Sequence, residues 1–188
     1  MNYHKIEPCS MLNGESLRTV LWISGCTLKC PKCFNPQTWD FDSGKDFNYE
    51  ALTELFEAVS KPYIKGLTLT GGNPLDLRNL YSVSQLVKNF HDHFKDTKDL
   101  WIYTGYTWEE ICQMTQVEYY TSIIGKELML YGILNRTNVV VDGRYVDELN
   151  DVKFPYRGST NQRLIDVAAS RSSTEQYYKV EDMVEYEV

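Results

Sequence analysis

Short β-prone runs alternate with longer helical patterns along this chain, and this alternation restricts the fold more than any other feature. The β-prone runs cover residues 18–24, 66–70, 100–104, 137–141 and 163–167. Alternation of this kind predicts an α/β fold with parallel strands and outer helices. A complete (β/α) barrel takes about 250 residues. A chain of 188 residues is therefore expected to form an incomplete (β/α) barrel.

Three segments between these runs have the apolar spacing or the start signals of helices. In residues 48–60 the apolar side chains recur at i, i+3, i+4 and i+7, and Asn48 is a favourable N-cap. A second helix is predicted from an inner face made of Leu80, Val83, Val87, Phe90 and Phe94. Thr107 and Glu110 have the spacing of a capping box that opens a third helix. Residues 117–134 are predicted to be helical in part.

Composition and charge argue against some classes of function. The chain has 26 acidic and 19 basic residues, a net charge of −7 and no basic stripe, so we expect no direct nucleic-acid partner. No apolar run approaches the roughly 20 residues of a membrane-spanning helix, and residues 1–16 lack the apolar core of a signal peptide. We therefore predict a cytoplasmic protein with reduced thiols and no membrane association. Residues 1–169 are expected to form the domain, followed by a surface tail at residues 170–188.

Three of the five cysteines lie within eight residues, as C-x3-C-x2-C at Cys26, Cys30 and Cys33. They directly follow the first predicted strand, and the carboxyl ends of strands are where α/β folds place their chemistry. Closely spaced thiolates favour zinc or an iron-sulfur cluster. Three cysteines can hold three irons of a [4Fe-4S] cubane and leave the fourth iron open to a substrate or cofactor.

The cysteine spacing alone also permits a zinc site that is completed by His4, Cys9 or Cys112. The paired glycines at residues 71–72 weigh against this alternative. They end the second predicted strand, and glycine lets the backbone approach a small ligand closely. Later strand ends also carry polar, glycine-containing segments, which are expected at the same edge of the sheet.

Residues 25–35, GCTLKCPKCFN, and residues 71–74, GGNP, together resemble the radical S-adenosylmethionine (SAM) superfamily. Further segments are similar to glycyl-radical activating enzymes within it, and in particular to the activating proteins of anaerobic ribonucleoside-triphosphate reductases. These segments are residues 1–4, 33–39, 66–75, 101–106, 141–145 and 157–163. The resemblance is collinear from Met1 to about Val167.

The resemblance implies a partial barrel of the radical SAM type and one [4Fe-4S] cluster per chain, with Cys26, Cys30 and Cys33 as ligands. It implies that SAM binds the open iron and also contacts Lys32, Cys33, Phe34, Gly71, Gly72 and Asn73. Reduction of the cluster is then expected to cleave SAM into methionine and a 5′-deoxyadenosyl radical. That radical takes a hydrogen atom from a glycine of the partner and leaves a glycyl radical, and no acid-base side chain is needed.

The implied partners are the catalytic subunit of the reductase and a reduced flavodoxin or similar electron donor. A homodimer and a hetero-oligomer with the reductase are both compatible with the resemblance. One alternative keeps the SAM chemistry but changes the target to another glycyl-radical enzyme, such as pyruvate formate-lyase. A second alternative, from a different class, is a non-catalytic zinc-binding module.

Two positions depart from the superfamily pattern. Lys32 stands directly before the third cysteine, where many members have an aromatic residue, and Phe34 follows that cysteine. Either Lys32 or Phe34 is therefore a candidate for contact with adenine. Asn73 stands where an acidic residue is usual. An amide can accept a hydrogen bond from the SAM amino group, but it carries no charge.

Overall fold

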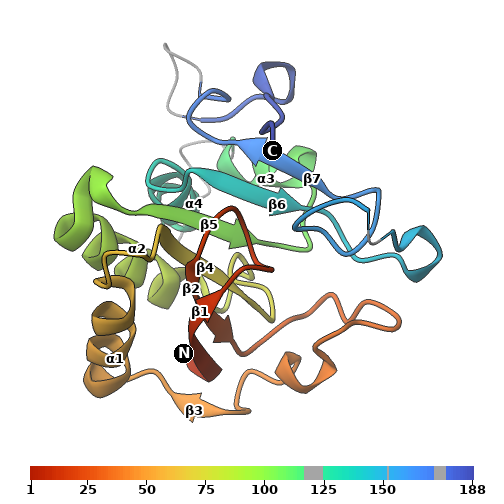
Figure 1. Cartoon of the computed structure of the whole chain (residues 1–188). Helices are drawn as coiled ribbons and strands as arrows, with labels where there is room; N and C mark the ends of the chain where they lie inside the picture. Colours follow the sequence, from red (N-terminus) through yellow and green to blue (C-terminus); the bar gives the residue numbers. More distant parts are fainter. Residues whose placement is uncertain (117–124, 152, 172–176) are drawn as a thin grey trace.

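In the computed structural model, which describes residues 1–116, 125–151, 153–171 and 177–188, one open sheet organises the chain (Figure 1). Within the described residues the sheet has seven strands in the order β3-β1-β2-β4-β5-β6-β7. Their bounds are β1 (Asn2–Ser10), β2 (Arg18–Ile23), β3 (Lys45–Asp46), β4 (Gly66–Gly71), β5 (Asp99–Tyr103), β6 (Val139–Asp142) and β7 (Arg163–Asp166). The fold is thus mixed α/β with a sheet that does not close.

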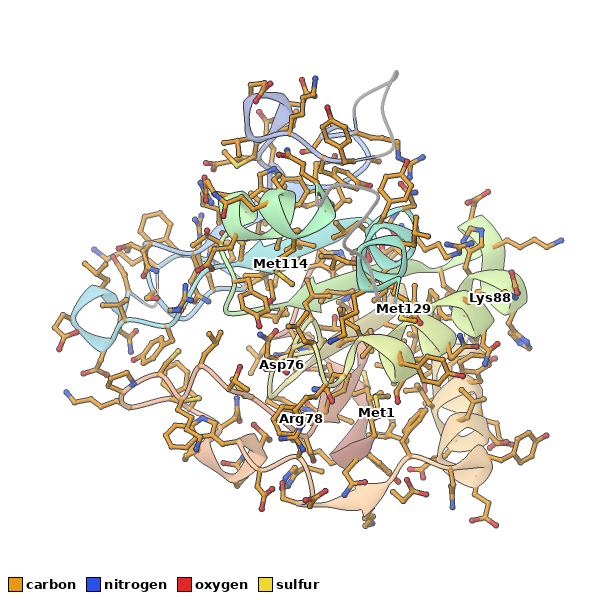
Figure 2. The ribbon with its side chains drawn as sticks, turned by 180° about the vertical axis from the view of Figure 1, so that it is seen from behind. Met1, Asp76, Arg78, Lys88, Met114 and Met129 are labelled. Carbon is orange, nitrogen blue, oxygen red and sulfur yellow. The ribbon has the colours of Figure 1, made fainter. Side chains whose placement is uncertain are left out.

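The helices pack on one face of this sheet, which is the nearer face in Figure 2. They are α1 (Tyr49–Val59), α2 (Leu80–Phe94), α3 (Trp108–Thr115) and α4 (Lys126–Leu134). Short 3-10 helices lie at η1 (Pro36–Thr38), η2 (Lys95–Thr97), η3 (Asp147–Leu149) and η4 (Val180–Asp182). Asn48 caps α1 by accepting from the Ala51 amide at 3.0 Å, and Thr107 and Glu110 form the predicted capping box of α3.

Most of the predicted elements are confirmed. Strands β2, β4, β5 and β6 are parallel neighbours, and all five residues predicted for the inner face of α2 are buried. Helix α4 confirms helical structure in the later part of residues 117–134, while residues 117–124 lie outside the described part of the chain.

Three strands differ from the expected parallel arrangement. β7 runs antiparallel to β6, because the described residues of the 143–162 connection contain no crossover helix of the kind that a parallel return requires. β1 and β3 were not predicted, and both pair antiparallel at one edge of the sheet. β1 contains Pro8 and only one buried apolar residue, Tyr3, so it lacks the hydrophobic pattern of an inner strand.

The two faces of the sheet have different chemistry. Alternate residues of the parallel strands, such as Leu21, Leu69 and Ile102, join the apolar core beneath the helices. The residues between them point to the other face, which carries Trp22, Thr70 and Tyr103 as well as a smaller apolar cluster. The face without helices is therefore the concave surface on which the chain can build a site.

Arg18 joins three strands at the amino end of this concave face. Its side chain is fully buried, and its Nε donates to Thr68 Oγ1 at 2.8 Å. The guanidinium also pairs with Asp99 at the start of β5 and lies 5.0 Å from the centre of the Trp101 ring. A buried charge needs such partners, and those of Arg18 come from the neighbouring strands β4 and β5.

Residues 177–188 return to the sheet. The Asp166 amide donates to Val184 O at 2.9 Å, and the Tyr186 amide donates to Leu164 O at 2.8 Å. Tyr178 is fully buried against Trp108, with ring centres 5.5 Å apart. The expectation of a surface tail therefore does not extend to Tyr178. Among the residues that the structure describes, no helix has the length and apolar character needed to cross a membrane.

We predict that Tyr178→Ala lowers the free energy of unfolding by about 3–5 kcal/mol, because it removes a large buried ring. Tyr178→Phe is expected to cost about 1 kcal/mol, since it keeps the ring and loses only the hydroxyl, which donates to Asn135 Oδ1 at 3.1 Å and is also hydrogen-bonded by Arg171. Urea unfolding followed by circular dichroism measures both. Tyr81→Ala, at a 64% exposed position on α2, is the control and should change little; equal effects at residues 81 and 178 would contradict the packing of the tail.

Candidate functional site

The three clustered cysteines lie on the cysteine loop, which we define as residues 24–42 after β2. Two backbone hydrogen bonds close its base, from Gly25 N to Thr38 O at 2.7 Å and from Cys26 N to Trp39 O at 3.0 Å. Lys29 and Lys32 have φ values of +46° and +55°, and each directly precedes a cysteine. Left-handed backbone is unfavourable for lysine, so this loop conformation must be held by its surroundings.

The glycine loop, residues 71–75 after β4, lies against the cysteine loop. Gly72 N donates to Ile23 O at 2.7 Å, and Asn73 N donates to Gly25 O at 2.8 Å. A Cβ atom on Gly72 would lie 2.4 Å from Gly25 O, so only glycine fits at this contact. The sequence-based expectation that the glycines lie beside the cysteines is therefore confirmed.

Both loops line one cavity of about 360 Å³ on the concave face of the sheet. All three clustered cysteines, Gly71 and Gly72 contribute to its wall. Glycines from two further connections complete the wall, namely Gly105 after β5 and both Gly143 and Gly158 between β6 and β7. Aromatic rings also surround the cavity: Trp22, Phe34, Trp39, Tyr103, Tyr145 and Tyr156. The site therefore combines soft sulfur donors, exposed backbone and flat apolar surfaces.

Burial affects the ionisation of groups at the cavity. Burial raises the pKa of the Cys26 thiol, and the backbone N–H groups of Lys29 and Leu28 partly oppose this shift. A thiol becomes a metal ligand only as the thiolate, so a bound cation is needed to draw the proton from Cys26.

The two candidates for adenine contact occupy different places. Lys32 points away from the cavity, where its Nζ donates to Asp147 Oδ2 at 2.5 Å. Phe34 lines the cavity, and its ring centre lies 4.6 Å from that of Tyr145. Of the two side chains, only Phe34 presents a surface to a molecule inside.

Asn73 is part of the glycine loop, but its side chain is buried and does not line the cavity. Its Oδ1 accepts from Thr104 Oγ1 at 2.8 Å and from Leu75 N at 3.2 Å. Its Nδ2 is buried and has no hydrogen-bond partner among the described protein groups. The acceptor on which the predicted contact with the SAM amino group depends is thus already engaged, and that contact stays a prediction.

Comparison with known proteins agrees with the motifs. A family model described as a 4Fe-4S single cluster domain matches residues 12–165. An anaerobic ribonucleoside-triphosphate reductase-activating protein of Enterobacteria phage T4 is 39% identical over 87% of this chain and 93% of its own length. Proteins of the same name from Vibrio cholerae and Escherichia coli K12 are 34% and 32% identical, over 86% of this chain and 96% of theirs.

The chain belongs to this family of activating proteins. Membership explains why segments that are distant in sequence, such as residues 141–145 and 157–163, meet at one cavity. Tyr145 and Gly158 lie in these segments, and only the resemblance predicts a part for these two residues. The local sequence around Tyr145 and Gly158 does not indicate a functional site, because neither a tyrosine nor a glycine is diagnostic of one by itself.

The alternative of a zinc knot finds no support in this geometry. His4, Cys9 and Cys112 do not line the cavity, and Cys112 is fully buried in α3. Within the described ranges, no three His, Cys, Asp or Glu side chains are gathered closely enough to hold one metal ion. A cubane is larger than a single ion, so its ligands stand further apart than the ligands of a zinc ion.

We predict that Gly72→Ala lowers the free energy of unfolding by about 1–3 kcal/mol, because the added methyl group forces the cysteine and glycine loops apart. Gly132→Ala in α4 is the matched control. The nearest atom to its Cβ would be Arg136 Nη1 at 3.6 Å, and alanine should stabilise the helix by about 0.5–1 kcal/mol. Urea unfolding of the metal-free variants measures both changes, and a Gly72→Ala variant as stable as wild type would refute the close contact.

Proposed function

We propose that this chain activates an anaerobic ribonucleoside-triphosphate reductase by forming a glycyl radical on it, and that its open sheet is a partial barrel of the radical SAM type. The observation that carries this proposal is the shared cavity. Three cysteines and a glycine loop face it in a chain that matches activating proteins of that name along most of its length. A cluster and a small cofactor therefore have room to lie side by side.

Cys26, Cys30 and Cys33 would hold the [4Fe-4S] cluster. The donor set fits, because thiolates are the usual ligands of iron-sulfur clusters and these three lie together at the cavity wall. The amide of Asn35 already donates to Cys33 Sγ at 3.4 Å, a contact that favours a thiolate ligand. When reduced by one electron, such a cluster supplies the chemistry that splits SAM into methionine and a 5′-deoxyadenosyl radical, which becomes 5′-deoxyadenosine on taking a hydrogen atom from glycine.

The chain's own residues would bind and orient SAM. Gly71 and Gly72 bring the backbone to the cavity wall, where no side chain blocks the methionine end of SAM. Phe34 and Tyr145 supply adjacent rings against which adenine can stack. We assign Lys32 an indirect role, because its ion pair with Asp147 ties the cysteine loop to η3 near these rings.

The partner polypeptide would enter beside the loop that joins β1 to β2. Leu12 in this loop lines the cavity and is 82% exposed, and its neighbour Met11 is 69% exposed. Exposed apolar side chains at the mouth of a reactive cavity favour protein contact. A reductase segment that carries the reacting glycine must pass them, so we propose that they contact the reductase.

Several aspects of this proposal rest on the family resemblance. A cytoplasmic one-electron donor, such as a reduced flavodoxin, is required, because none of the described side chains supplies the electron. A homodimer and an assembly with the reductase remain expectations, and neither is needed for the chemistry at the cavity.

The main prediction is that the protein, reconstituted anaerobically with iron and sulfide and then reduced, converts SAM to methionine and 5′-deoxyadenosine. With the reductase added, electron paramagnetic resonance (EPR) should detect a glycyl radical. Cys26→Ser should abolish both, since it removes a cluster ligand. Cys9→Ser is the matched control, because Cys9 is exposed and outside the cavity, and it should behave as wild type.

Three results of this experiment would count against the proposal. A colourless protein that retains zinc after reconstitution would favour the binding module. A radical formed on pyruvate formate-lyase but not on the reductase would change the target. A loaded, reduced cluster that leaves SAM intact would exclude the reaction itself.

A second prediction concerns the entry route. Leu12→Glu should lower glycyl-radical formation about tenfold relative to the SAM cleavage that the same variant shows without the reductase, because it places a charge in an apolar contact. The control is Leu128→Glu, at a 71% exposed position on α4 behind the sheet. Both variants are compared by EPR at limiting reductase. Equal radical yields from the two variants would exclude Leu12 from the contact.

A further inference from the structure

The turn between β4 and α2 contacts the cysteine loop through three side chains. We define it as the 76–79 turn, with Asp76, Arg78 and Asn79 as its contacting residues. Figure 2 labels Asp76 and Arg78 on this turn, seen from the side of the helices. Asp76 and Asn79 are each 2% exposed, although their side chains are polar. Buried polar groups need specific partners, and here the partners lie on both sides of the first cysteine.

Asp76 holds the residue after Cys26. Its Oδ2 accepts from Thr27 N at 3.2 Å and from Thr27 Oγ1 at 2.6 Å. Its Oδ1 accepts from Arg78 N at 3.1 Å, so both carboxylate oxygens are engaged. Hydrogen bonds to a charged acceptor are stronger than those between neutral groups.

Asn79 holds the residues before Cys26 and, at the same time, the glycine loop. Its Nδ2 lies 3.1 Å from Ser24 O and 3.3 Å from Gly25 O, to which it donates. It also donates to Asn73 O at 3.0 Å. One amide group therefore contacts carbonyl oxygens of both loops and sets the distance between them.

Arg78 supports the same region through an aromatic ring. Its guanidinium carbon lies 3.7 Å from the centre of the Phe41 ring. Phe41 in turn packs directly against Gly25, where an added Cβ would lie 2.2 Å from a ring atom. This stack closes the side of the cysteine loop that faces away from the cavity.

We infer that Asp76 and Asn79 are positioning residues that hold Cys26 and the glycine loop in one fixed arrangement. The inference rests on the proposed function for its consequence, which is that the cluster and SAM meet in a reactive geometry. Neither side chain lines the cavity, so both act through the residues they hold.

The first test needs no metal. Asp76→Asn keeps the shape of the side chain but leaves one oxygen to serve two sets of donors, Thr27 and Arg78. Amide hydrogen exchange of residues 24–28 in the metal-free protein should become about tenfold faster, since a charge-assisted contact is lost. Unchanged exchange in this segment would refute the inference, whatever the activity of the loaded enzyme.

The second test separates positioning from general stability. Asn48→Ala removes the cap of α1, whose hydrogen bond is to Ala51 of the same helix, and serves as the matched control. After reconstitution, Asp76→Asn is expected to retain iron but to show an altered EPR spectrum of the reduced cluster on addition of SAM. Asn48→Ala should give the wild-type spectrum. The same spectrum from Asp76→Asn and wild type would overturn the inference.

The third test uses the partner of Asp76. Thr27→Val removes the hydroxyl donor while keeping the shape of the side chain. In a double-mutant cycle with Asp76→Asn, the two effects on amide exchange should be clearly less than additive, because both remove one contact. Fully additive effects would show that the contact does not position the loop. Failure of wild type to cleave SAM would instead count against the proposed function and leave the exchange result standing.

Discussion

The parallel pairing of β2 with β4 is the constraint on which the site depends. Ile23 is paired with Gly71, so the cysteine and glycine loops leave the sheet at the same level on adjacent strands. Close backbone contact follows, because Gly72 has no side chain to keep the chain away from Gly25. A shift of the register by one residue would reverse the faces of β2 and remove Trp22 from the cavity.

This register explains what the sequence predicts well. Strands β2, β5 and β6 are buried and have continuous apolar runs, and β4 alternates leucine with β-prone threonine, so all four are easy to recognise. The cysteines and glycines of the site form local motifs directly after two of these strands. The edge strand β1 lacks such a run, and the direction of β7 depends on a connection whose described residues form only the 3-10 helix η3 and no crossover helix, which is visible only in the structure.

Other parts of the site have no signal in the sequence because they arise from contacts between distant segments. Asn79 is an ordinary helix-start residue until the fold places Ser24 and Gly25 next to it. Lys32 and Phe34 were equal candidates for adenine contact while the direction of each side chain was unknown. The ion pair with Asp147 and the ring contact with Tyr145 distinguish them, and both partners come from the connection after β6.

The support of the cysteine loop also bears on how a cluster would be acquired. Metal binding and folding are coupled when a site does not exist beforehand, and part of the binding free energy is then used to order the ligands. Here the base of the loop is closed by backbone hydrogen bonds to Thr38 and Trp39, and the 76–79 turn holds both flanks of Cys26. Cys30 and Cys33 lie further along the same loop and have fewer such contacts. If the three cysteines hold a cluster as we propose, ordering on binding should be concentrated at residues 29–34, because Cys26 is already in place.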